Sequence, residues 1–155
     1  MAQLFDEITA AIKQAEKKNM IPCFRLNLTS DLPWESIKHE GKSMMEHFPD
    51  QIFYDYSKDA GRAAATIADP AWPKNYQITL SRSETNDKLI FCAMKSKVNV
   101  AVVFRGKLPS TWNDAPVVDG DETDLRFLDP KGCVVGLVEK GLAKKDSTGF
   151  VIEPS

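Results

Sequence analysis

The chain has 155 residues, which fits one domain with room for a hydrophobic core. Its 20 Lys and Arg residues nearly balance 22 Asp and Glu residues, and this argues against a non-specific nucleic-acid-binding protein, which normally carries a marked basic excess. No apolar stretch approaches the roughly 20 residues that span a bilayer, and no signal-peptide apolar region follows Met1. We therefore expect a cytoplasmic protein with no membrane partner.

Short β-prone runs alternate with helix-like segments from the N-terminus onward. The strands are expected at residues 23–29, 52–56, 76–80 and 98–104. Apolar residues at helical spacing predict helices at residues 3–18, 34–48 and 83–95, and the alanine-rich residues 59–68 predict another, which ends before Pro70. The β-α-β-α-β-α-β order predicts a single α/β domain over residues 1–155, with a mainly parallel sheet and right-handed crossovers.

The sequence changes character after residue 105. Residues 106–130 are rich in Pro, Gly and Asp and are expected to form an ordered loop region with one short strand at 116–119. Residues 133–138 predict a further strand, which we expect in the centre of the sheet. Residues 139–155 are polar, so we expect a loop-rich C-terminal extension.

Each of the first four strands ends in a burst of polar residues. Ligands of α/β folds lie at the carboxyl ends of parallel strands, so these bursts indicate where a site would be without specifying its chemistry. With polar residues of the strands and of the later loops added, the candidate ligand- or partner-binding residues are Arg25, Asn27, Asp31, Asp55, Lys58, Thr79, Ser81, Arg82, Glu84, Asp119, Asp121 and Arg126.

Polar residues alternate with apolar ones in three of these strands, although a parallel strand covered on both faces normally reads as a continuous apolar run. The alternation predicts that one sheet face is polar and that the helices cover only the other face. Two interpretations remain open. The polar face is either the concave lining of a partial β/α barrel or a surface that is solvated or covered by a partner.

Arg25 lies in the middle of the first predicted strand, between two apolar residues. An enclosed guanidinium needs a carboxylate, and we expect Asp55 as its partner in preference to Asp31. For a buried structural pair, removal of Arg25 is expected to lower the free energy of unfolding by about 3–5 kcal/mol.

No residue pattern specifies a metal, a cofactor or a catalytic group. The aspartates between residues 118 and 129 could supply oxygen ligands to Mg²⁺ or Ca²⁺, but they lack the calcium-loop order, so we interpret them as turn residues with Arg126 pairing one of them. The three dispersed cysteines are interpreted as structural thiols, buried at Cys23 and Cys133. His39 and His47 are interpreted as solvated helix residues. We therefore expect no metal, no cofactor and no catalytic residue.

An ordered series of motifs resembles a family of bacteriophage and plasmid proteins of the gene product 88 type. The motifs are Ile21-Pro-Cys-Phe-Arg-Leu-Asn-Leu-Thr-Ser-Asp-Leu-Pro-Trp34, Phe48-Pro49, Phe53-Tyr-Asp-Tyr-Ser-Lys58, Asn75-Tyr-Gln-Ile-Thr-Leu-Ser-Arg-Ser-Glu84, Asn99-Val-Ala-Val-Val-Phe104 and Asp119-Gly-Asp-Glu-Thr-Asp-Leu-Arg-Phe-Leu-Asp-Pro-Lys-Gly132. The resemblance covers roughly residues 21–150. It implies a partial barrel related to radical-SAM-like proteins.

Longer members of that family carry a cysteine-rich N-terminal segment suggestive of an iron–sulfur site, whereas this chain has the amphipathic helix 3–18 instead. The resemblance thus implies a non-catalytic accessory protein of a phage or mobile element in the cytoplasm of a bacterial host cell. It would bind and inhibit or regulate a host or defence protein or ribonucleoprotein complex, such as a CRISPR-type assembly. The alternative is an enzyme that binds a nucleotide or small anion at the strand ends through Arg25, Lys58 and Arg82. A dimerisation module is a third hypothesis.

Overall fold

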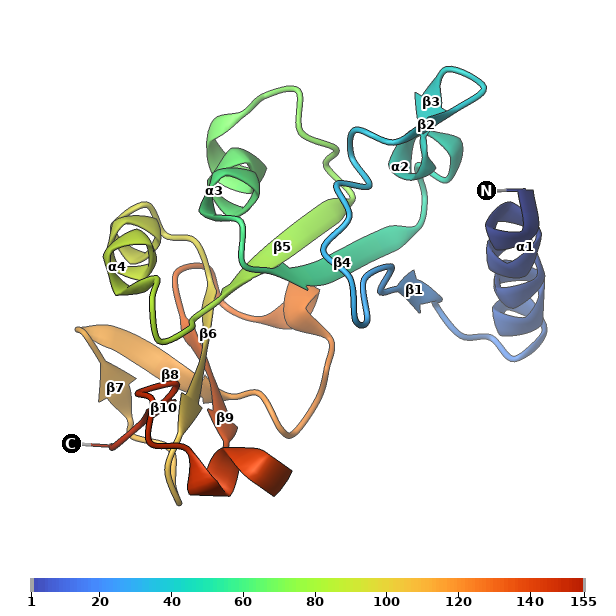
Figure 1. The fold of residues 1–155 in the computed structure, drawn as a ribbon. Coiled ribbons are helices and arrows are strands. Elements are labelled where there is room, and N and C mark those ends of the chain that lie inside the picture. The colour runs from blue at the N-terminus through green and yellow to red at the C-terminus, as the bar shows by residue number, and fades with distance from the viewer. Residues whose placement is uncertain (1, 155) are drawn as a thin grey trace.

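The computed structural model describes residues 2–154 and forms a mixed α/β fold (Figure 1). The helices are α1 (Ala2–Lys17), α2 (Met44–His47), α3 (Ala60–Ala68) and α4 (Asp87–Lys95), with 3-10 turns η1 (Arg126–Leu128) and η2 (Gly141–Lys145). The strands are β1 (Cys23–Phe24), β2 (Lys38–His39), β3 (Lys42–Ser43), β4 (Ile52–Ser57), β5 (Tyr76–Ser81), β6 (Val100–Phe104), β7 (Thr111–Trp112), β8 (Ala115–Asp119), β9 (Val134–Val138) and β10 (Val151–Ile152). Within the described residues, no helix is long and apolar enough to cross a membrane.

The main sheet has the strand order β1-β4-β5-β6-β9-β8-β7, and β10 pairs separately with β6. All of its pairs are parallel except the hairpin of β7 and β8. Helices α3 and α4 contact each other and pack on the central strands. The predicted fold class is therefore confirmed: a mainly parallel sheet with its helices on one face, an N-terminal amphipathic helix and a loop-rich C-terminal extension. That extension also supplies β10.

The prediction of a long second helix over residues 34–48 is wrong. Residues 34–36 form a turn, and β2 and β3 then form a hairpin whose turn places Glu40 and Gly41 at positive φ, 50° and 81°. Helix α2 begins only after Ser43, whose hydroxyl accepts a hydrogen bond from the Glu46 amide while the Glu46 side chain accepts one from the Ser43 amide. This capping box fixes the start of the helix at Met44.

The first strand is also shorter than predicted, because pairing with β4 stops at Phe24. From residue 25 the chain leaves the sheet, and its hydrogen bonds go to side chains instead. The histidines differ from expectation as well. His39 lies in β2, His47 lies in α2, and both rings contact Phe5 of α1, at centroid distances of 4.8 Å and 4.7 Å.

Register decides which side chains share a face of the sheet. Paired residues of neighbouring parallel strands lie on the same face, and β4 pairs with β5 through Asp55–Ile78 and Tyr56–Thr79. Asp55 therefore faces the helices, whereas Thr79 lies on the opposite face beside Tyr56. The prediction that three strands place their polar residues on one face is wrong, because the polar patterns of β4 and β5 are offset by one residue in this register.

Both faces of the sheet are partly buried. The larger apolar cluster lies on the helix side and includes Phe53, Leu80, Ile90, Val100, Phe104 and Val134. On the other side, the η1 segment covers β4 and β5: the Phe127 ring packs 5.6 Å from that of Tyr54, and Gln77 Nε2 donates to the Arg126 carbonyl at 3.3 Å. A second, smaller apolar cluster on this side contains Ala101, Cys133 and Val135.

The two halves of the sheet meet over a short contact. Strands β5 and β6 pair only through Leu80–Val100 and Ser81–Ala101, whereas β4–β5 and β6–β9 each pair over five positions. Because β9 occupies the other edge of β6 along its whole length, β5 and β10 must share the remaining edge. Arg82 follows β5 at this point, and its Nη1 donates to the carbonyls of Gly149 and Phe150 at 2.8 Å and 2.9 Å.

We expect Arg82→Ala to lower the free energy of unfolding by about 2–4 kcal/mol, because it removes a buried side chain and leaves the partly buried carbonyls before β10 without their donor. The partly exposed Asp87, which accepts from Arg82 Nε at 2.7 Å, adds little to this cost. Urea denaturation measures the change. Lys88→Ala, on the exposed side of α4, is the matched control and should stay within about 0.5 kcal/mol of wild type. Equal stabilities of the two variants would contradict the role given to Arg82.

Candidate functional site

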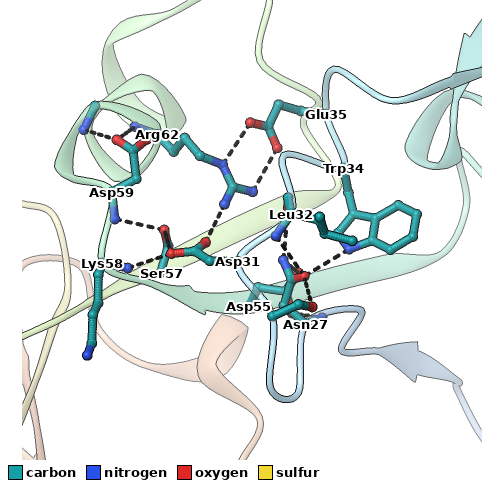
Figure 2. A network of polar contacts seen from close by, with 12 residues as sticks. Asn27, Asp31, Leu32, Trp34, Glu35, Asp55, Ser57, Lys58, Asp59 and Arg62 are labelled. Carbon is teal, nitrogen blue, oxygen red and sulfur yellow. Dashed lines mark hydrogen bonds and ion pairs between the residues drawn. The ribbon is translucent and has the colours of Figure 1, made fainter.

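A network of polar side chains lies at the carboxyl ends of β1 and β4 (Figure 2). At its base is Asp55, which is fully buried on the helix face of β4. Its carboxylate accepts hydrogen bonds from the Asn27 amide at 2.7 Å, from Asn27 Nδ2 at 3.3 Å and from the Tyr76 hydroxyl at 2.8 Å. Burial raises the pKa of Asp55 above its ordinary value, although the hydrogen bonds from Asn27 and Tyr76 oppose this shift.

Asn27 organises the loop that follows β1. Its Oδ1 accepts hydrogen bonds from the Ser30 hydroxyl at 2.8 Å and from the Leu32 amide and the Trp34 indole, both at 3.1 Å. Its Nδ2 donates to the Leu32 carbonyl at 3.0 Å. One buried side chain thus replaces the strand pairing that ends at Phe24, and it holds residues 27–34 in a defined shape.

Arg62 of α3 joins this loop to the helix. Its guanidinium binds Glu35 through two parallel hydrogen bonds of 2.8 Å and 2.9 Å, and it also binds Asp31 at 2.6 Å. A further N–H donates to the Tyr76 hydroxyl at 3.2 Å. The Arg62 side chain is 10% exposed, so these bonds are better protected from water than a surface ion pair.

The turn from β4 into α3 is closed by two carboxylates, Asp31 and Asp59. Asp31 accepts hydrogen bonds from the Ser57 hydroxyl and the Lys58 amide, both at 2.9 Å. Asp59 caps α3 by accepting from the amides of residues 61 and 62. The ammonium of Lys58 takes no part, and Figure 2 shows its side chain pointing away from the network.

A groove of about 700 Å³ opens beside this network, with Glu35, Arg62 and Trp72 in its walls. It lies against α3 and the 69–75 segment. Within residues 2–154, no group of three or more His, Cys, Asp or Glu side chains is placed to hold a metal ion. Cys133 is buried, as expected, and burial raises its pKa to about 11, whereas Cys23 is only half-buried and Cys92 is exposed.

Arg25 does not bind Asp55 or Asp31, so that prediction is wrong. Its Nη1 donates to Asp124 at 3.1 Å, and its guanidinium lies 4.7 Å from the centre of the Tyr56 ring. Tyr56 is on the face opposite to Asp55, so the side chain of Arg25 extends to the other side of the sheet. Its partner comes from the Asp-rich loop, 99 positions along the chain.

The remaining candidate residues lie apart from the network. Arg82 is buried at the β5–β10 junction, Ser81 accepts a hydrogen bond through its carbonyl from Asn86 at 2.9 Å, and Glu84 is exposed. Thr79 is buried on the sheet face opposite to α3. The candidates thus form several groups rather than one site, and only Asn27, Asp31, Asp55 and Lys58 meet at one place.

The Asp-rich loop is held by internal contacts. Asp121 pairs with Lys140 at 2.6 Å, which lowers the pKa of Asp121, and Asp119 accepts from the Asp121 amide at 2.8 Å. Arg126 is fully buried and lies 3.4 Å from Asp129, which confirms the expectation that it pairs with a carboxylate of this loop. These residues serve the loop's own structure.

Sequence reasoning missed Arg62, Glu35 and Tyr76, which are central to the network. Arg62 is the one charged residue inside the alanine-rich segment of α3, and an isolated cation on a helix that packs against a sheet is the signal that could have identified it. Glu35 lies in the segment that apolar spacing predicts as a helix but that forms a turn. Tyr76 begins a strand, and its position in the sequence gives no sign of a polar contact.

The comparisons agree with the resemblance seen in the motifs. A family model described as "Gene product 88" matches residues 1–154. Neither the curated proteins nor the solved structures yield a match. The relation to radical-SAM-like proteins stays a prediction.

We expect Arg25→Ala to lower the free energy of unfolding by only about 0.5–1 kcal/mol, because its partner Asp124 is half exposed and the stacking on Tyr56 adds a small amount. A double-mutant cycle with Asp124→Ala, followed by urea denaturation, isolates the pair. A loss of about 3 kcal/mol or more, as for a buried pair, would contradict the observed geometry.

Because burial raises the pKa of Asp55, its carboxyl group stays protonated in the folded protein at a pH where it has lost the proton in the unfolded chain. The stability linked to that proton is complete below the ordinary pKa of about 3.9 and is lost as the pH rises through the folded-state pKa. The free energy of unfolding of wild type, minus that of Asp55→Asn, should therefore fall as the pH rises above the ordinary carboxyl pKa. Urea titrations at several pH values test this, and a difference that rises with pH would refute it.

Proposed function

The chain belongs to the gene product 88 family, and from this premise we propose that it is a non-catalytic accessory protein of a phage or mobile element. It binds a protein or ribonucleoprotein complex of the bacterial host, with a CRISPR-type defence complex as the first candidate. Binding inhibits or regulates that complex in the host cytoplasm.

One observation carries the choice of a binding role over an enzyme: the arginines at the strand ends are already engaged inside the protein. Arg25 pairs with Asp124, Arg62 pairs with Glu35 and Asp31, and Arg82 binds Asp87 and two carbonyls. Of the three cations expected to hold a phosphate at the strand ends, only Lys58 has its charged group outside such contacts. An anionic substrate would have to displace existing bonds, which weakens the alternative of a nucleotide enzyme acting there.

The hydrogen bonds of Asn27 favour a rigid loop after β1 that a protein partner can recognise. Residues 27–34 are held by Asn27, and within them Leu28 and Leu32 are 78% and 45% exposed. A loop that is ordered before binding avoids most of the entropy cost of ordering at the interface, and exposed leucines supply apolar area to bury. We therefore assign the partner contact to this loop, with its surface at Leu28 and Leu32.

The proposal predicts that Leu28→Asp combined with Leu32→Asp weakens partner binding about ten-fold or more, because charges replace the apolar contact. The tagged protein is purified from cells that express a defence complex, and the co-purified complex is quantified. In the same host, wild type should raise the plating efficiency of a targeted phage, and the double variant should not.

Leu142→Asp is the matched control, because Leu142 is 88% exposed but lies in η2, far along the chain from the loop. It should behave as wild type in both assays. Equal protection by wild type and the double variant, or no effect of wild type on any defence complex tested, would reject the proposal. Light scattering measures the oligomeric state of the free protein. If wild type and the double variant have the same state, the loss of binding concerns a host partner and not self-association.

A further inference from the structure

The short contact between β5 and β6 leaves a cleft at the amino ends of these strands. The β5 residues before Leu80 have no ladder partner in β6, and a cleft of about 470 Å³ lies at this position. Thr66 of α3 forms part of one wall and Phe127 of η1 part of another, so the cleft lies between elements that cover opposite faces of the sheet. Tyr76, at the amino end of β5, lines the cleft, and its hydroxyl reaches Arg62 and Asp55 of the network.

The charge of the cleft is mainly positive. Its lining contains Lys74, Lys97 and Lys131 against one carboxylate, Asp129. All three lysines are exposed, and in the part of the chain that the structure describes none of them forms an ion pair. Asp129 already faces the buried Arg126 at 3.4 Å, so its charge is engaged there rather than with the lysines.

The backbone is built to keep two of these lysines together. Gly132 has φ of 75°, and a Cβ at this position would lie 2.9 Å from Lys97 Cδ. Glycine therefore allows the loop that carries Lys131 to pack directly on Lys97, which itself has φ of 62°. Lys97 and Lys131 therefore extend from adjacent backbone segments, and an anion bound beside them would be attracted to both.

Unpaired buried polar atoms gather at the same place. Among residues 2–154, the buried side-chain atoms without a hydrogen-bond partner are Thr79 Oγ1, Asn99 Nδ2, Arg126 Nε, Arg126 Nη1 and Asp129 Oδ2. Asn99 and Asp129 line the cleft, and Arg126 lies behind Asp129. Because Leu80 pairs with Val100, Thr79 lies next to Asn99 in the extended register.

The orientation of Asn99 makes it a donor toward a ligand. Asn99 is 6% exposed, and its Oδ1 accepts a hydrogen bond from the Gly132 amide at 2.6 Å. This contact fixes the amide so that Nδ2 is the free group. Arg126 Nη1 and Asp129 Oδ2 face each other at 3.4 Å, so Asn99 Nδ2 is the donor of the cleft lining that lacks a partner. Nearly all buried donors in folded proteins are paired, so the group that completes this site should carry an acceptor oxygen.

We propose that the cleft between β5 and β6 binds a small organic phosphate of the mononucleotide class. The phosphate lies among the three lysines and accepts from Asn99 Nδ2. The planar part packs against the aromatic side chains of the lining, Trp72, Tyr76 and Phe127. The volume is in the range of about 300–1,000 Å³ that small-molecule sites occupy.

Isothermal titration of the full chain with the four ribonucleoside 5′-monophosphates, with adenosine and with inorganic phosphate tests the assignment. At least one monophosphate should bind saturably, about ten-fold or more tighter than inorganic phosphate, and more weakly as salt is added. Adenosine should bind more weakly than its monophosphate. No saturable binding by any monophosphate, or equal binding of inorganic phosphate, would overturn the proposal.

Variants locate the site. Asn99→Asp keeps the oxygen that Gly132 contacts but replaces the free donor by an anionic oxygen, so it should weaken binding by about ten-fold or more. Lys74→Gln combined with Lys131→Gln alters only exposed side chains and should weaken binding comparably while leaving the melting temperature of the free protein nearly unchanged. Lys88→Gln, outside the cleft, is the control. Unchanged affinity in the double lysine variant would overturn the proposal even if Asn99→Asp failed to fold.

Discussion

The fold depends on the two residue pairs that join β5 to β6. Each half of the sheet is well paired internally, but Leu80–Val100 and Ser81–Ala101 alone connect the strands of the two halves. Parallel strands that twist away from each other leave space on both sides of such a junction. On one side Arg82 and β10 fill the space, and on the other side the cleft with Asn99 remains. The position of both features therefore follows from one short contact.

Internal compensation of arginine charge is the second organising constraint. Arg62 is enclosed between a helix and a loop and has two carboxylates and a phenol as partners, whereas Arg25 at the edge is satisfied by one half-exposed aspartate. Arg126 is the exception, because it is fully buried and two of its nitrogens make no hydrogen bond, although Nη1 lies 3.4 Å from Asp129. These arginines therefore serve the structure, whereas the three lysines of the cleft, Lys74, Lys97 and Lys131, form no ion pair with the described residues. This division explains why a region rich in charged residues need not be the region that binds an anion.

Much of the framework could be predicted from the sequence. Strands β4, β5, β6 and β9 are continuous apolar or alternating runs, and α1 and α3 have clear helical periodicity, so local pattern was sufficient. The partner of Arg25 was beyond such reasoning, because Asp124 lies 99 positions away and register decides the face on which Arg25 extends. The prediction of a helix over residues 34–48 was wrong, because the hairpin turn at Gly41 and the capping box at Ser43 decide the local structure more strongly than the spacing of apolar residues. After β1, hydrogen bonds from the Asn27 side chain take the place of backbone pairing between strands. Such a substitution produces no periodic pattern in the sequence, so it could not be predicted.

The placement of β10 has a consequence for the order in which the sheet is completed. Strand β6 pairs with β9 along one edge, but part of its other edge pairs with Val151 and Ile152 of β10. A partly folded chain in which β10 has not yet docked therefore exposes an apolar strand edge at the centre of its sheet. Such edges are the usual sites of wrong pairing between neighbouring chains.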